Sequence, residues 1–253
     1  MTRIISKEGK VLPLLSWDKR GSLIHSLTNQ YLLKPLQIAE QAGLGLSMVV
    51  RAALGLDALE GRVLAIADNT LSGVVVQAAA RQILQAGAEV NLWKSFAVCE
   101  EEEIGLSFEE TSKELSLQLK SRGVEIKEIK GEEVFLSEEN LKNYHLVLLG
   151  INPKALWFSK NALVLNESAV PVHCVDCPWG VDPRDGTAER NAIFSSSTLF
   201  LGLPFEACLQ QRDFFGRLYL TDISCPLEEY RKFLPDFISP FSAQPVVQLF
   251  LKD

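Results

Sequence analysis

From Gly61 onward, short apolar runs of strand length alternate with longer amphipathic segments of helix length. This alternation predicts strands at 63–67, 89–93, 124–129, 145–149, 170–176, 199–203 and 217–223, and helices at 73–85, 107–122, 137–143 and 206–212. Strands that alternate with helices are joined by right-handed crossovers, and these give a parallel sheet covered on both faces. The chain is therefore expected to have an α/β fold.

The segments outside this alternation are expected to differ in structure. Helices are predicted at 16–28, with Ser16 as N-cap, and at 34–54, where apolar residues recur at helical spacing. The tail from Pro226 is expected to be a surface segment or a strap over one sheet edge. The acidic run 100–103 is interpreted as a solvated loop.

Composition excludes some classes of function. Lys and Arg number 25 against 32 Asp and Glu, and this net charge of −7 argues against a general nucleic-acid binder, which needs a positive surface. No apolar run has the length of a membrane span, and the start has no apolar stretch typical of a signal peptide. The odd count of five cysteines does not suggest a disulfide framework. We expect a cytoplasmic protein with no nucleic-acid or membrane partner.

Ligands of parallel α/β sheets bind beyond the carboxyl ends of the strands, where the strand order reverses. The first predicted strand ends in a polar turn that leads into a helix, which is a generic anion site. Its candidate ligand-binding residues are Asn69, Thr70, Ser72 and Gly73. The same residue types form turns and helix caps, and the pattern favours this structural role over ligand binding.

A second candidate site follows the strand predicted at 170–176. Asp176 ends this strand, and a Pro-Trp-Gly bend follows it. Because a buried carboxylate is costly without partners, Asp176 is the leading catalytic candidate, and a structural role in holding the loop is the alternative.

His173, Cys174 and Cys177 lie in the same segment. A CxxC pair without a second pair nearby lacks the ligands of a structural zinc site. In an extended strand, His173 and Cys177 point to one face and Cys174 to the other. We interpret the cysteines as buried strand residues and predict no metal site.

Five stretches in order resemble those of one known family. They are Ile38-Ala39-Glu40-Gln41-Ala42-Gly43, Ala80-Arg81 with Gly87, Asp176-x-Pro178-x-Gly180, Ser197-Thr198-Leu199-Phe200, and Asp222-Ile223 with Pro226. In these stretches the chain resembles the NAD(P)H-hydrate epimerase family, the YjeF N-terminal domain, from about Leu12 to Pro226.

The resemblance implies a single Rossmann-like three-layer α/β/α sandwich with a mostly parallel sheet and N-terminal helices. The one domain would span 1–253, with a helical region at 1–60, a core at 61–225 and a tail at 226–253. Members of the family interconvert the R and S forms of hydrated NADH and NADPH with a bound potassium ion, and they are often homodimers.

The family's potassium ligands are replaced in this sequence. The family loop Gly-x-Gly-Asn-Asn-Gly-Gly-Asp-Gly aligns with 68–76, where only Gly73 is kept as a glycine. The three positions whose side chains would contact the ion are Leu71, Leu149 and Trp179, none of which carries an oxygen ligand. The resemblance therefore implies that the potassium site is lost, while Asp176, the family's substrate-contacting carboxylate, is retained.

Three hypotheses for the function follow. The chain is a degenerate member that lacks the potassium-dependent epimerase activity and binds a nucleotide-like small molecule or a partner in the altered crevice. Alternatively, it is an active epimerase that works without the ion, with Asp176 as acid or base and Lys154 supplying a positive charge. The third hypothesis is an interaction module with a filled pocket. The ring of Trp179 could stack on a nucleotide base in the first hypothesis, or fill the cavity in the third.

Overall fold

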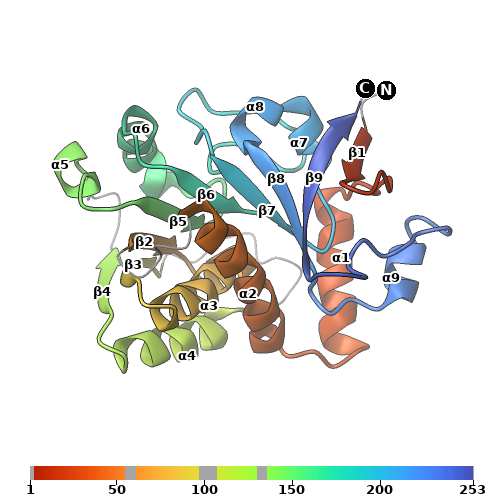
Figure 1. Cartoon of the computed structure of the whole chain (residues 1–253), viewed down its shortest axis with the longest axis horizontal. Helices are drawn as coiled ribbons and strands as arrows, with labels where there is room; N and C mark the ends of the chain where they lie inside the picture. Colours follow the sequence, from red (N-terminus) through yellow and green to blue (C-terminus); the bar gives the residue numbers. More distant parts are fainter. Residues whose placement is uncertain (1–2, 55–60, 97–106, 130–135, 253) are drawn as a thin grey trace.

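The protein is a single nine-stranded sheet with helices on both faces in the computed structural model, which describes residues 3–54, 61–96, 107–129 and 136–252 (Figure 1). The strand order is β1-β9-β8-β7-β6-β5-β2-β3-β4. The strands from β8 to β4 are parallel to one another, and only β9 and β1 are antiparallel to their neighbours. This architecture confirms the predicted Rossmann-like α/β fold.

The strands are β1 (Arg3–Ser6), β2 (Arg62–Ala67), β3 (Glu89–Ser95), β4 (Glu125–Ile129), β5 (Leu146–Gly150), β6 (Val172–Val175), β7 (Ser197–Leu201), β8 (Arg217–Thr221) and β9 (Val246–Lys252). The helices are α1 (Trp17–Asn29), α2 (Pro35–Leu54), α3 (Leu71–Gln85), α4 (Glu109–Lys120), α5 (Glu138–Leu141), η3 (Leu156–Phe158), α6 (Ser159–Glu167), α7 (Ala207–Gln210), α8 (Arg212–Phe215) and α9 (Leu227–Arg231).

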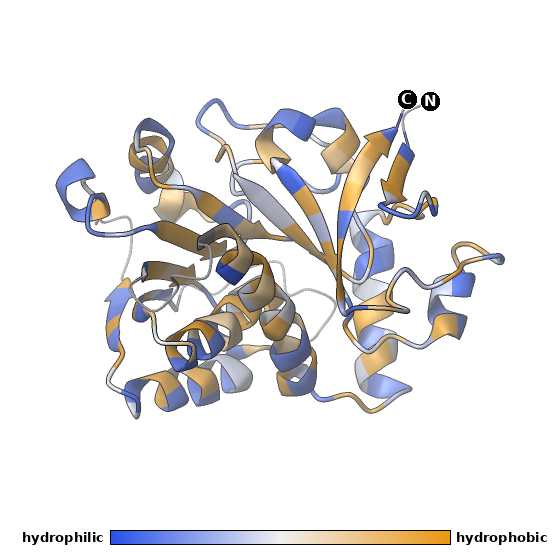
Figure 2. Ribbon diagram, viewed as in Figure 1, coloured by the Kyte–Doolittle hydropathy of each residue, from blue (hydrophilic) through white to orange (hydrophobic). Residues whose placement is uncertain are grey.

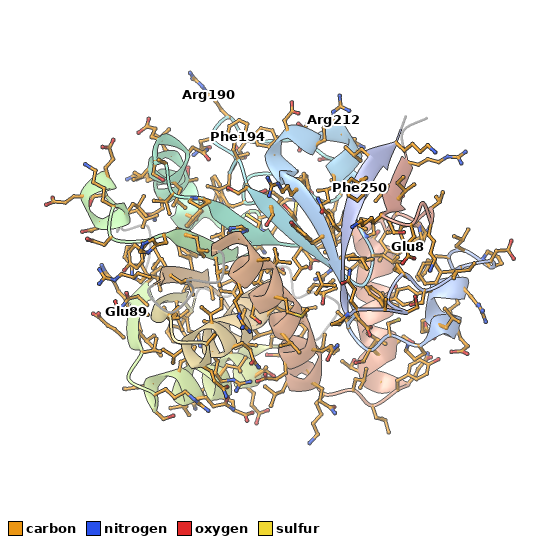
Figure 3. The ribbon with its side chains drawn as sticks, in the orientation of Figure 1. Glu8, Glu89, Arg190, Phe194, Arg212 and Phe250 are labelled. Atoms are coloured by element: carbon orange, nitrogen blue, oxygen red, sulfur yellow. The ribbon has the colours of Figure 1, made fainter. Side chains whose placement is uncertain are left out.

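Alternate residues of the central strands enter two separate hydrophobic clusters. In β5, Leu146 and Leu148 pack with α1, α2, α3 and α4, whereas Val147 and Leu149 pack with α5, η3 and α6. Figure 2 shows the apolar residues gathered on these central strands. The labelled charged side chains Glu89, Arg190 and Arg212 point away from the sheet in Figure 3 and are exposed. This two-sided burial explains why the strands read as continuous apolar runs.

The predicted elements of the core are present within a few residues of their expected bounds. The segment predicted as one helix at 206–212 forms two short helices, α7 and α8. Ser16 is the N-cap residue of α1, as predicted, although its side chain makes no capping hydrogen bond. The acidic run 100–103 lies outside the described residues.

The two ends of the chain extend the sheet. β9 pairs antiparallel with β8, and β1 pairs antiparallel with β9 from Arg3↔Lys252 to Ser6↔Leu249. The tail is therefore partly a strand of the sheet, not only a strap over its edge. Within the described residues, no helix is long and apolar enough to cross a membrane.

We predict that Gly45→Ala lowers the free energy of unfolding. Gly45 lies where α2 crosses β8, and a Cβ atom there would meet Thr221 Oγ1 at 2.2 Å and Thr221 Cβ at 2.9 Å. Overpacking of this kind costs about 1–3 kcal/mol. Urea unfolding measures the change. In a helix interior, alanine is more stable than glycine by roughly 1 kcal/mol. A gain of this size in Gly45→Ala would contradict the close packing of α2 against Thr221.

Candidate functional site

The strand order reverses between β2 and β5, which are neighbours although β3 and β4 lie between them in sequence. Asp68 follows β2 at this point and is 1% exposed. Its Oδ1 accepts hydrogen bonds from Thr70 N at 2.9 Å and Thr70 Oγ1 at 2.6 Å, and its Oδ2 accepts one from Asn152 N at 2.7 Å. The carboxylate therefore joins the loop after β2 to the loop after β5.

The amino end of α3 is the predicted anion site. Thr70 is the N-cap of α3, and its Oγ1 accepts a hydrogen bond from Gly73 N at 3.2 Å. Thr70 N, which an incoming anion could bind, donates to Asp68 instead. A helix amino end favours negative charge. Here an internal carboxylate already supplies that charge.

Asp176 lies two strands away from β2, directly after β6, and is 2% exposed. Its backbone φ of 60° is left-handed, a conformation that aspartate adopts more readily than most residues. Oδ1 accepts a hydrogen bond from Leu201 N at 2.9 Å, and Oδ2 accepts one from the guanidinium of Arg20. The leading catalytic candidate thus takes part in a buried ion pair.

Arg20 comes from α1, and sequence reasoning missed it. The side chain is 2% exposed, and its guanidinium carbon lies 5.4 Å from the ring centroid of Trp17 and 5.7 Å from that of Phe205. A fully buried arginine is rare unless it is paired. Nothing in the local sequence separates Arg20 from an exposed helix arginine, because its partner is 156 positions away.

A small cavity adjoins Asp176 at the carboxyl ends of the strands. The cavity there has a volume of about 10 Å³, room for one water molecule. It is lined by Trp17, Thr70, Ser72, Ile151, Asn152, Pro153, Val175, Asp176 and Cys177. Gly150 lets β5 approach α3 closely, since a Cβ atom there would lie 2.2 Å from Ser72 O. The end of β5 and the amino end of α3 are therefore in direct contact at the place where a ligand would enter.

The residues at the aligned potassium positions do not fit a potassium ion. Leu71 is fully buried in the cluster on the α3 side of the sheet, whereas Leu149 and Trp179 are buried in the cluster on the α6 side. None offers an oxygen. Within the part of the chain that the structure describes, no group of three or more His, Cys, Asp or Glu side chains is placed to hold a metal.

The predicted ligand-binding residues are divided among separate cavities. Thr70 and Ser72 line the small cavity beside Asp176, and Asn69 lines another of about 590 Å³ beside Lys94. Lys154 and Trp179 line one of about 500 Å³. Gly73 packs against the backbone of Asp68. The structure thus brings Thr70, Ser72 and Asp176 together and places the others elsewhere.

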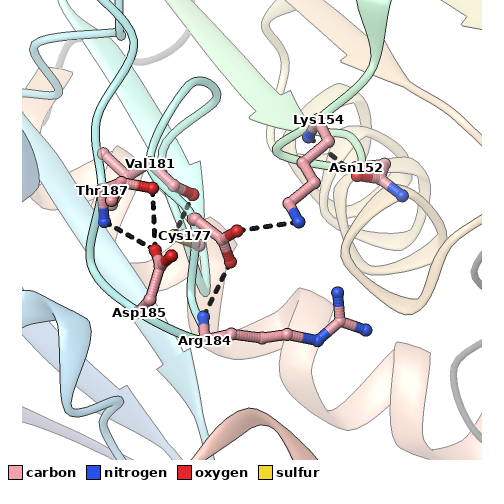
Figure 4. A network of polar contacts seen from close by, with 8 residues as sticks. Asn152, Lys154, Cys177, Val181, Arg184, Asp185 and Thr187 are labelled. Carbon is pink, nitrogen blue, oxygen red and sulfur yellow. Dashed lines mark hydrogen bonds and ion pairs between the residues drawn. The ribbon is translucent and has the colours of Figure 1, made fainter.

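Lys154 and Trp179 are both held by neighbours in the loops after β5 and β6. Lys154 Nζ forms an ion pair of 2.7 Å with Asp182, and its backbone N donates to Asn152 Oδ1 (Figure 4). Trp179 Nε1 donates to Ala155 O at 2.8 Å, and its ring meets Phe158 edge-on with centroids 5.7 Å apart. The tryptophan is 4% exposed, so it fills the core.

The cysteines of the CxxC pair lie in opposite clusters, Cys174 on the α6 side and Cys177 on the α3 side. Burial raises the pKa of both thiols well above the usual value, which keeps them protonated at neutral pH. Cys177 donates a hydrogen bond to Val181 O at 3.3 Å. Both cysteines are buried as predicted, but only Cys174 lies in a strand, because β6 ends at Val175.

A family model described as YjeF-related protein N-terminus matches residues 35–207, more than half of the chain. The chain belongs to this family. The match begins after α1, so Arg20 lies outside the matched part, whereas Asp176 lies inside it.

One solved structure shares this fold over nearly its whole length. The crystal structure of yeast ynu0, YNL200c, is similar over 94% of this chain and 100% of its own, with 18% identity and a TM-score of 0.78. A dipicolinate synthase from Bacillus halodurans is similar only in part, over 56% of this chain and 41% of its own, with 17% identity and a TM-score of 0.33. Comparison with curated proteins gives no significant match.

We predict that Arg20→Met lowers the free energy of unfolding by about 3–5 kcal/mol, because it leaves the buried Asp176 carboxylate without its cation. Lys154→Met breaks a half-exposed pair and should cost no more than about 1 kcal/mol. Urea unfolding of both variants measures the difference.

A double variant, Arg20→Met with Asp176→Asn, removes both charges. It should lose less stability than the sum of the two single changes. Equal losses for Arg20→Met and Lys154→Met would contradict a structural role for the buried pair.

Proposed function

We propose that this member of the YjeF-related family is non-catalytic and acts as a binding module, with the fold's usual ligand crevice closed. The proposal rests on the hydrogen-bond partners of the Asp176 carboxylate and on the small space beside it. Its carboxylate is directed at Arg20 and Leu201 N, both inside the protein, and the adjoining cavity holds only about 10 Å³.

Acid–base catalysis by Asp176 would require a substrate atom within hydrogen-bond distance of the carboxylate. A carboxylate paired with a buried arginine is held in its charged form and is already satisfied as an acceptor. Separating Arg20 from Asp176 to admit a substrate would leave both buried charges without their partner, which is destabilising. These costs argue against the second hypothesis, an epimerase without the ion.

A hydrated dinucleotide also does not fit the crevice by size. Small-molecule pockets usually have volumes of about 300–1,000 Å³. The cavity beside Asp176 is far below this range. Asp68 would in addition repel a phosphate at the amino end of α3. The proposal therefore favours the filled-pocket hypothesis over a nucleotide-like ligand at this edge.

A binding module needs surfaces other than the crevice. Leu44 and Met48 are exposed one turn apart on α2, each at 40%. The family resemblance suggests a homodimer, and these two side chains are available for such a contact. The homodimer and the cytoplasmic location stay predictions.

The proposal predicts that the purified protein does not equilibrate the R and S forms of hydrated NADPH faster than the spontaneous reaction, with or without potassium. The epimer ratio is followed with time, beside an active family member as positive control. Equilibration at an enzymatic rate that disappears in Asp176→Asn would overturn the proposal and restore the epimerase hypothesis.

A further inference from the structure

A cavity of about 540 Å³ lies at the opposite edge of the sheet from the closed crevice. It is formed where the strands β5 to β8 begin, beneath the last turns of α2. Its size falls in the range of about 300–1,000 Å³ that is usual for small-molecule sites. The polar residues His145, His173, Ser197, Arg217 and Tyr219 line it together with apolar residues such as Val49.

Three of these residues form a row across neighbouring parallel strands. His173 of β6 is in register with Ser197 of β7, and Ser197 is in register with Arg217 of β8. Residues in register point to the same face of a sheet. Tyr219 follows Arg217 by two positions and shares that face. The sheet thus presents four polar side chains to one cavity.

His173 has an unused hydrogen-bonding atom. Its Nδ1 lies 2.6 Å from Ser197 Oγ, whereas Nε2 is buried and has no hydrogen-bond partner among the described residues. The residue is 4% exposed. A buried polar atom without a hydrogen-bond partner is destabilising, and a ligand that forms the missing hydrogen bond would explain it. Burial lowers the pKa of His173 to about 4, so the ring is neutral near pH 7.

The other polar groups offer donors and positive charge. Within the described ranges, no carboxylate lies at ion-pair distance from Arg217, and no acidic residue lines the cavity. His145 Nδ1 accepts a hydrogen bond from Arg62 N at 3.0 Å, which leaves the proton of the neutral ring on Nε2. Arg217 disfavours a metal cation in this cavity, so the charge pattern selects an anion.

We propose that this cavity binds a small organic anion, a carboxylate with an apolar body. Arg217 pairs with the anionic group, and His145 Nε2–H and the Tyr219 hydroxyl supply further donors. The Ser197 hydroxyl donates to His173 Nδ1, which places the His173 proton on Nε2. The apolar body lies against Val49 and Leu146.

Proton NMR of the full chain can test this site, because the protein has only 3 histidines, His25, His145 and His173. Their ring signals are assigned with single His→Gln variants. Benzoate is the probe, and benzamide is its neutral counterpart of the same shape. We expect benzoate to shift the His145 and His173 signals saturably. The signal of His25, which bonds with Asn29 on α1 and does not line the cavity, should not move.

Arg217→Met should raise the Kd for benzoate about tenfold or more, because it removes a charge-assisted contact. Arg217 is exposed, so the variant should fold normally. Arg231→Met, an exposed arginine of α9 outside the cavity, is the matched control and should leave the Kd unchanged. Benzamide should bind at least about tenfold more weakly than benzoate for the same reason.

The proposal is overturned if benzoate leaves the His145 and His173 signals in place. It is equally overturned if benzamide or Arg217→Met gives the same Kd as benzoate with the unaltered protein. None of these results bears on the closed crevice, because the two sites lie at opposite edges of the sheet. Failure here would leave the proposed lack of epimerase activity standing.

Discussion

The buried ion pair between Arg20 and Asp176 connects the N-terminal helix to the carboxyl edge of the sheet. Removing two charges from water is costly, and an ion pair offsets this cost only when its geometry is good and the remaining acceptors are satisfied. Asp176 meets this condition through Leu201 N, and Arg20 lies against the rings of Trp17 and Phe205. The position of α1, the end of β6 and the end of β7 therefore depend on one another.

The same principle acts on Asp68 at the point where the strand order reverses. In a ligand-binding α/β fold, this place leaves backbone donors free for an anion from outside. Here the Asp68 carboxylate takes up donors from the loops after β2 and β5. The family fold is thus retained, and these backbone donors bind a carboxylate of the protein itself. A cavity of about 540 Å³ lies where the strands β5 to β8 begin, beside His173 and Arg217.

Most core strands and helices could be predicted from the sequence because their apolar patterns are local, whereas η3 and α6 were missed. β1 and β9 could not, since each is stabilised by pairing with a partner far along the chain. Asp176 was recognised as a polar residue at a strand end, but its partner Arg20 lies in a helix whose pattern gives no sign of a buried charge. Asp68 follows the first predicted strand, and only the meeting of two loops in the structure reveals that it joins them. His173 lies in a predicted strand, and its unpartnered Nε2 becomes visible only in three dimensions.

Donors from within the protein satisfy the carboxylates of Asp68 and Asp176. Amide hydrogen exchange at Thr70, Asn152 and Leu201 tests this most directly, because these three backbone groups donate to Asp68 and Asp176. We predict slow exchange that hydrated NADPH leaves unchanged. Fast exchange at these amides, or new protection when hydrated NADPH is added, would show an open crevice and contradict the account.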